Sequence, residues 1–148
     1  MSKMTMDQAI AALEEVVAEF GEDYKYKHPE GSMDTCYYSD EAGNPGCIVG
    51  QVLAKHFPEE LETIHRYEWE GAEVITTEDG SYAYVVPKTD GEALDSTEWA
   101  GRVFTKEAVY VLFGAQQVQD GGSRWGEALD EAKTRAINLK VLTTGSAE

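Results

Sequence analysis

The sequence has few cysteines, few basic residues and no long hydrophobic run, and each scarcity excludes a class of protein. Two cysteines in 148 residues are too few for a disulfide framework, so both are expected as thiols, with one Cys36–Cys47 disulfide as the alternative. No apolar run approaches the roughly 20 residues that span a bilayer. The first residues lack the apolar stretch of a signal peptide, which favours a cytoplasmic protein without membrane contact.

Basic residues are outnumbered: 12 lysines and arginines stand against 28 aspartates and glutamates, giving a net charge of −16. Such a charge repels phosphate backbones and anionic lipid surfaces, so direct binding of nucleic acid or of a membrane is not expected. The charge agrees with a basic protein partner, with metal binding, or with a surface that only confers solubility. The oligomeric state, including a homo-oligomer, is left open.

The hydrophobic content of 42% is enough for one core in a chain of 148 residues. We therefore expect residues 1–148 to form a single domain. Within it, residues 68–101 are expected to form an acidic hairpin and loop insertion. Residues 142–148 are expected to fray as a C-terminal tail.

Helical periodicity is clearest near the N-terminus. The apolar residues there recur at steps of three and four: Met6, Ile10, Leu13, Val17 and Phe20. Thr5 and Gln8 have the spacing of a capping box, and Gly21 stands where a helix commonly ends. These features predict a helix over 5–20.

The middle of the chain alternates between strand-like and helix-like segments. A short strand is expected at 35–39, and two helices at 47–57 and 59–66, which Pro58 separates. Residues 72–86 favour strands on either side of an Asp-Gly pair, a sequence typical of a tight hairpin turn.

The C-terminal third returns to helical spacing, with Thr105 and Ser123 as the expected N-caps of two further helices. The fold class predicted from the whole pattern is α+β. It comprises an N-terminal helix, a short strand, a helix pair, an acidic β-hairpin and a C-terminal helical pair. This order also fits a winged-helix arrangement, although the helix that would read DNA is acidic rather than basic.

Acidic residues are densest between residues 68 and 98, where nine acidic residues occur with a single basic residue, Lys88. Carboxylates held on a hairpin would imitate spaced phosphates and fit the basic groove of a protein that binds nucleic acid. The alternative is a solvated loop whose charges keep an edge strand soluble. The residues expected to bind a partner are Glu68, Trp69, Glu70, Glu73, Glu78, Asp79 and Trp99.

A second candidate site is the glycine-containing turn before the predicted helix at 47–57. Asn44, Gly46 and Cys47 lie where backbone N–H groups at a helix start bind anions, which predicts a pocket for a small molecule or a nucleotide. Cys47 is also the candidate nucleophile of a cysteine-dependent enzyme, because a helix N-terminus lowers a thiol's pKa. No histidine stands out as its base, so no catalytic residue is assigned, and burial of Cys47 is the alternative.

Metal binding has little support in the sequence. Cys36, Cys47, His56 and His65 are the potential soft ligands, but their spacing matches no zinc module. The acidic residues also lack the alternating pattern of a calcium loop. No metal and no cofactor is therefore expected.

Two blocks carry a resemblance to a known group of proteins. Residues 36–53, with the run GNPGCIVGQVL, and residues 115–128, with AQQVQDGGSRWGEA, are similar to small mycobacteriophage-like proteins encoded by phages of actinobacteria. The resemblance implies a setting in a bacterial host and carries over no catalytic residue. In that setting we expect a non-enzymatic phage accessory protein that binds and modulates a basic host or defence protein through its acidic surface.

Overall fold

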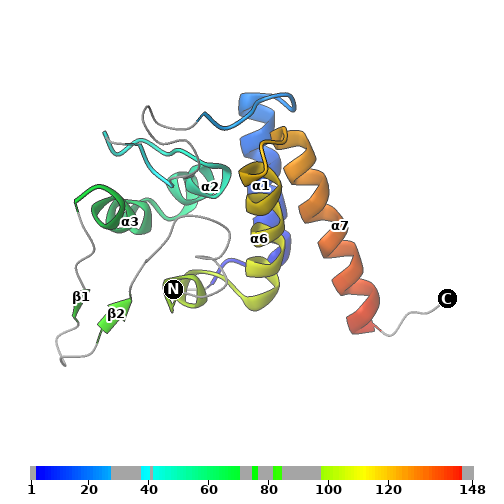
Figure 1. Ribbon diagram of the computed structural model, residues 1–148. Helices are drawn as coiled ribbons and strands as arrows, with labels where there is room; N and C mark the ends of the chain where they lie inside the picture. The colour runs from blue at the N-terminus through cyan, green and yellow to red at the C-terminus, as the bar shows by residue number, and fades with distance from the viewer. Residues whose placement is uncertain are drawn as a thin grey trace.

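The computed structural model describes residues 3–27, 38–40, 42–70, 75–76, 82–84 and 98–144, and most of these lie in helices (Figure 1). The helices of the described residues are α1 (Met6–Phe20), α2 (Ile48–His56), α3 (Pro58–Glu70), α5 (Glu98–Val103), α6 (Lys106–Asp120) and α7 (Trp125–Thr144). Helices α1, α6 and α7 run side by side and form the body of the molecule, and α2 and α3 lie to one side of it (Figure 1).

Two short strands accompany the helices. Strands β1 (Ile75–Thr76) and β2 (Tyr82–Tyr84) pair antiparallel, and the register shifts by one residue within the pair. The pair lies beyond α3 at the edge of the molecule, on the side away from α7 (Figure 1). The expected Asp79-Gly80 turn lies outside the described residues.

The predicted α+β fold class is wrong, and the protein is mostly helical. Strands of two and three residues make no sheet that could cover a helix layer. At the strand expected over 35–39, Ser39 forms only an isolated bridge with Pro45, and residues 35–37 lie outside the described part. The winged-helix arrangement is wrong with it, because that arrangement needs a sheet as a layer.

The predicted N-terminal helix is confirmed, together with its capping box. Thr5 Oγ1 accepts the backbone N–H of Gln8 at 3.2 Å, and Gln8 Oε1 accepts the N–H of Thr5 at 2.9 Å. Gly21 ends the helix with a φ of 98° and donates its N–H to Val17 O at 2.7 Å. A positive φ is readily adopted only by glycine, which is why α1 stops there.

The two helices predicted after the turn are also confirmed. Helix α2 follows Cys47 and α3 begins at Pro58, but α3 extends four residues beyond the predicted 59–66, to Glu70. The side chain of Cys47 does not cap α2. Instead, Gln119 of α6 accepts the backbone N–H of Ile48 at 2.7 Å, so a residue distant in sequence caps this helix.

At the C-terminal pair, the cap of α6 is confirmed and that of α7 is wrong. Thr105 Oγ1 accepts the N–H of Ala108 at 3.1 Å. Helix α7 starts one residue later than a Ser123 cap would place it, because the carbonyl of Arg124 accepts the first helical N–H, from Ala128 at 3.1 Å. Helix α7 continues through Thr144, into the segment expected as a tail, and residues 145–148 lie outside the described residues.

The core lies where α1, α2, α6 and α7 meet, and 26 buried apolar residues of the described part contribute to it. Trp125, which stands four residues before Leu129 at helical spacing, is fully buried there. Its indole ring contacts Phe20 and Tyr24, with ring centroids 5.1 and 4.5 Å away. The first residue of α7 thus packs against the last residue of α1 and the segment that follows it.

Candidate functional site

The turn between residues 40 and 46 is held together by Asp40. Its Oδ1 accepts the N–H groups of Ala42 at 3.0 Å and Asn44 at 2.8 Å, and its Oδ2 accepts from Asn44 Nδ2 at 3.3 Å. Gly43 adopts a φ of 93° within this turn. An aspartate that bonds to N–H groups two and four residues ahead closes a tight turn, which here places Gly46 at the entry to α2.

A cavity of about 470 Å³ lies beside this turn, and we name it the turn cavity. It is lined by Glu19, Phe20, Tyr24, Tyr26, Lys27, Ser39, Asp40, Asn44, Pro45, Gly46 and Gln51. Two of the three candidate ligand residues, Asn44 and Gly46, are among them, and Asn44 is exposed. The amide of Gln51 is engaged within the protein, since Nε2 donates to the carbonyl of Pro45 at 3.0 Å.

Cys47, the third candidate, is a fully buried thiol in the hydrophobic core. The alternative of burial is therefore confirmed for this residue. The two described histidines pair elsewhere: His56 Nε2 lies 3.1 Å from Glu15 Oε1, and His65 Nδ1 lies 3.0 Å from Ser39 Oγ. A nucleophilic thiol has to be accessible to its substrate, so the burial of Cys47 argues against Cys47 as a nucleophile.

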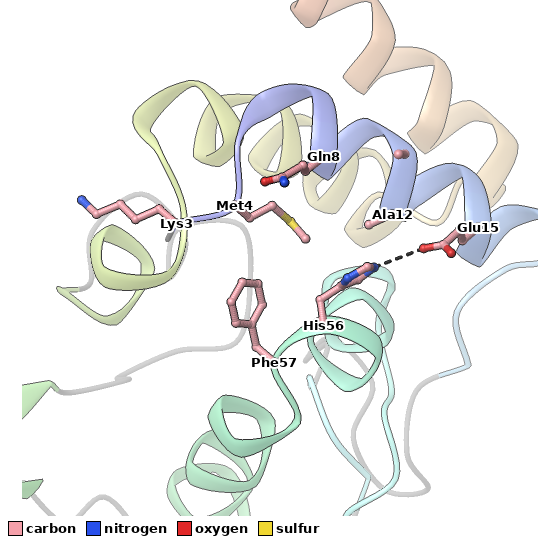
Figure 2. Close-up of a pocket in the computed structure, with 8 residues that line it drawn as sticks. Lys3, Met4, Gln8, Ala12, Glu15, His56 and Phe57 are labelled. Carbon is pink, nitrogen blue, oxygen red and sulfur yellow. Dashed lines mark hydrogen bonds and ion pairs between the residues drawn. The ribbon is translucent and has the colours of Figure 1, made fainter. Parts of the chain in front are cut away.

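A second cavity, of about 510 Å³, lies between α1 and α2 and was not anticipated from the sequence. We name it the α1–α2 pocket, lined by Lys3, Met4, Gln8, Ala11, Ala12, Glu15, His56 and Phe57. Figure 2 shows His56 directed toward Glu15 at one side of the pocket, with Met4 and Phe57 facing its interior. The adjacent alanines of α1 were the available signal, because small side chains on a helix leave room beside it.

The residues expected to bind a partner fall on two helices and outside the described residues. Glu68, Trp69 and Glu70 lie in the last turn of α3, and Trp99 lies in α5. The remaining three, Glu73, Glu78 and Asp79, lie outside the described residues.

The acidic residues of α1 are largely compensated by cations from other helices. The ion pairs are Asp7–Lys140 at 3.3 Å, Glu14–Lys133 at 3.2 Å, Glu15–His56 at 3.1 Å and Glu19–Lys55 at 2.6 Å. The hydrogen bond to Glu19 is the main cause that raises the pKa of Lys55 above its usual value. These pairs connect α1 to α2 and α7, and they neutralise much of the negative charge on α1.

The acidic residues of α3 differ from those of α1. Within the part of the chain that the structure describes, Glu59, Glu60 and Glu62 form no ion pair. Glu59 and Glu62 are exposed, and Glu60 is half-buried with one carboxylate oxygen that has no hydrogen-bond partner among the described residues. Among the described side chains, no ion pair therefore compensates the negative charge of these three glutamates.

Two further properties concern the class of protein. None of the described helices is long and apolar enough to cross a membrane. Three or more histidine, cysteine, aspartate or glutamate side chains do not come together as a metal site anywhere in the described ranges. Comparison of the chain with protein-family models gives no match, and comparisons with the curated proteins and with the solved structures give none either.

Proposed function

We propose that the chain is a non-enzymatic binding protein that engages a basic protein surface through the acidic residues of α3 and the acidic stretch that follows. The α3 acidic segment is defined as Glu59, Glu60, Glu62, Glu68 and Glu70. The observation that carries the proposal is the contrast between α1, whose acids are ion-paired, and α3, whose described acids are not. Uncompensated charge attracts an oppositely charged partner and accelerates its association.

The position of two of these acids strengthens the argument. Glu68 and Glu70 lie in the last turn of α3, which contains no basic residue. The carbonyl groups at a helix C-terminus carry partial negative charge, so carboxylates there are unfavourable for the helix. Acids at positions where they cost stability are more readily explained by binding than by folding.

The resemblance to small proteins of actinobacterial phages supports a partner in the host cytoplasm. In that setting the partner would be a basic host or defence protein, and Trp69, between the two terminal acids, would supply an apolar anchor. Mimicry of a phosphate backbone is one form of this binding, since a basic groove accepts either anion.

The test is a double charge reversal, Glu62→Lys with Glu70→Lys, in a pull-down from nuclease-treated actinobacterial lysate. Lysine in the last turn favours the helix, so the variant should remain folded. We expect wild type to capture a basic protein at low salt and to release it at high salt. The variant should capture at least about tenfold less, because charge complementarity is reversed.

The matched control is Glu107→Lys with Asp130→Lys, which changes the net charge equally on α6 and α7. Both residues are exposed, and neither forms an ion pair within the described part of the chain. The control should capture the partner as wild type does. Equal capture by the two double variants would contradict a role for α3 and leave only a general charge effect.

A second candidate function is the binding of a small planar molecule, such as a nucleoside, in the turn cavity. The observation that favours it is the cavity itself, whose lining includes Phe20, Tyr24 and Tyr26 beside the exposed Asn44. Its volume of about 470 Å³ lies within the range of ligand pockets, and aromatic walls stack on planar rings.

A panel of nucleosides and nucleotides tested by thermal shift checks this second function. One member should raise the melting temperature, since a ligand that binds only the folded state stabilises it. The rise should disappear in Tyr26→Leu and persist in Tyr110→Leu, because Tyr110 is exposed on α6 away from the cavity. A flat response across the panel would remove the nucleotide hypothesis.

A further inference from the structure

The floor of the α1–α2 pocket is apolar and held in place by the fold. Met4 and Ala12 are buried, with 5% and 1% of their surfaces exposed. The backbone N–H of Met4 donates to Val103 O at 2.8 Å, and its carbonyl accepts from Thr105 N at 3.0 Å. These bonds attach the segment before α1 to the last residue of α5 and to the segment that follows it. The floor is therefore formed before any ligand arrives.

Phe57 provides the opposite wall of the pocket. It is the residue between α2 and α3, and its ring packs edge-on against buried Phe104 at a centroid distance of 5.9 Å. In Figure 2 the Phe57 ring lies across from Met4, and both face the space below α1. An apolar group of a ligand would thus be enclosed between a thioether, an aromatic ring and a helix.

The rim of the pocket carries a carboxylate whose present partner is a histidine. Glu15 Oε1 lies 3.1 Å from His56 Nε2, and the two side chains are 60% and 38% exposed. An imidazole is a full cation only when it is protonated, whereas a primary alkylamine is protonated at neutral pH, so its ammonium group is a stronger partner for Glu15. A ligand can therefore replace His56 at Glu15 without leaving a buried charge unpaired.

The other polar side chains of the lining do not compete for a cationic ligand. Gln8 is fixed by the capping box, in which its Oε1 accepts the N–H of Thr5 at 2.9 Å. Lys3 extends away from Glu15 and His56 in Figure 2. The net charge of −16 adds a long-range attraction for cations and a repulsion of anions.

We propose that the α1–α2 pocket binds a small amphipathic primary amine. The apolar body of the amine packs against Met4, Ala12 and Phe57, and its ammonium group pairs with Glu15. The volume of about 510 Å³ accommodates a ligand of this size. The inference does not depend on the proposed partner surface, because the described lining of the pocket includes no residue of the α3 acidic segment.

The test uses 2-phenylethylamine and the similarly sized anion 3-phenylpropionate as probes, titrated into the full chain and followed by amide NMR shifts. We expect the amine to shift the amides around Met4, Ala12 and Phe57 in a saturable way. The carboxylate should bind much more weakly, since it faces Glu15 and the net negative charge. Binding of the carboxylate as tightly as the amine would overturn the proposal, and so would the absence of saturable shifts with the amine.

Three variants localise the site. Ala11 is exposed and lines the pocket, whereas Ala18 is exposed on the same helix outside it, so Ala11→Leu should abolish binding and Ala18→Leu should not. Glu15→Gln should weaken binding of the amine by about fivefold, the upper range for a solvent-accessible ion pair. Unchanged amine affinity in Ala11→Leu would overturn the assignment to this pocket. A wild-type affinity in Glu15→Gln would overturn the role of the carboxylate.

Discussion

Gly50→Ala is expected to lower the free energy of unfolding by about 3 kcal/mol, the upper end for forced overpacking. Gly50 lies in the first turn of α2 and is buried. A Cβ at this position would overlap the carbonyl oxygen of Tyr38 and lie 2.8 Å from its carbonyl carbon. Tyr38 is fully buried, and its carbonyl accepts the N–H of Gly46 at 2.8 Å, so the backbone has no room to move away.

A loss of stability in Gly50→Ala would distinguish the close contact with Tyr38 from helix propensity, because the two predict effects of opposite sign. Alanine is favoured over glycine within a helix by up to about 1 kcal/mol, so helix propensity alone predicts that Gly50→Ala stabilises. Gly101 in α5 is the matched control, because no atom of the described residues lies within 4 Å of the Cβ that alanine would add. Urea denaturation should give a large loss for Gly50→Ala and no loss for Gly101→Ala. Equal stability of both variants would show that α2 does not approach Tyr38 this closely.

Trp125→Ala is expected to cost about 3–5 kcal/mol, the usual range for removing a large aromatic side chain from a core. The fully buried indole packs edge-on against Phe20 and Tyr24 and is the largest buried side chain among the described residues. Its loss leaves a cavity where α7 meets the end of α1. Since small proteins are stable by only about 5–15 kcal/mol, such a variant should be close to unfolding at physiological temperature.

Trp125→Phe separates the packing of the ring from its hydrogen bonding. The indole Nε1 is buried and has no hydrogen-bond partner in the described part of the chain, so phenylalanine removes an unsatisfied polar atom. We expect the loss of unfolding free energy for Trp125→Phe to be less than half of that for Trp125→Ala in the same urea titration. Equal losses for the two variants would mean that the indole nitrogen is bonded in solution.

Local features of the sequence predicted the helix ends well, because each depends on residues within one turn. Thr5 and Gln8 satisfy each other's backbone groups three residues apart, and Thr105 caps α6 over the same distance. The predicted cap at Ser123 was wrong because the local bond at this helix start is made by Arg124. The N–H of Arg124 donates to Glu127 Oε1 at 3.1 Å, a bond between residues three apart, as in the capping box.

The fold class was predicted wrongly because strand propensity depends on what a segment packs against. Residues 72–86 are rich in residues that favour strands, yet β1 and β2 together contain five residues. The helices instead bury their apolar faces against one another. A short strand pair gives them no better surface, so the core forms among the helices.

The two candidate cavities also differ in how far apart in the sequence the residues that form them lie. The Asp40–Gly46 turn is formed by neighbouring residues, so the sequence indicated that Asn44 and Gly46 would lie at a candidate ligand site. The α1–α2 pocket joins residues of α1 to His56 and Phe57, about 40 positions away, and no local pattern connects them.

By itself, the sequence determined the approximate positions of α1, α2, α3, α6 and α7, the caps of α1 and α6, and the overall negative charge. Tertiary structure decided which carboxylates are neutralised, what caps α2 and where cavities remain. Ile48 receives its cap from Gln119, 71 residues later, and Glu15 pairs with His56, 41 residues later. Contacts at such separations are set by the packing of whole helices, whereas a capping box is complete within a single turn.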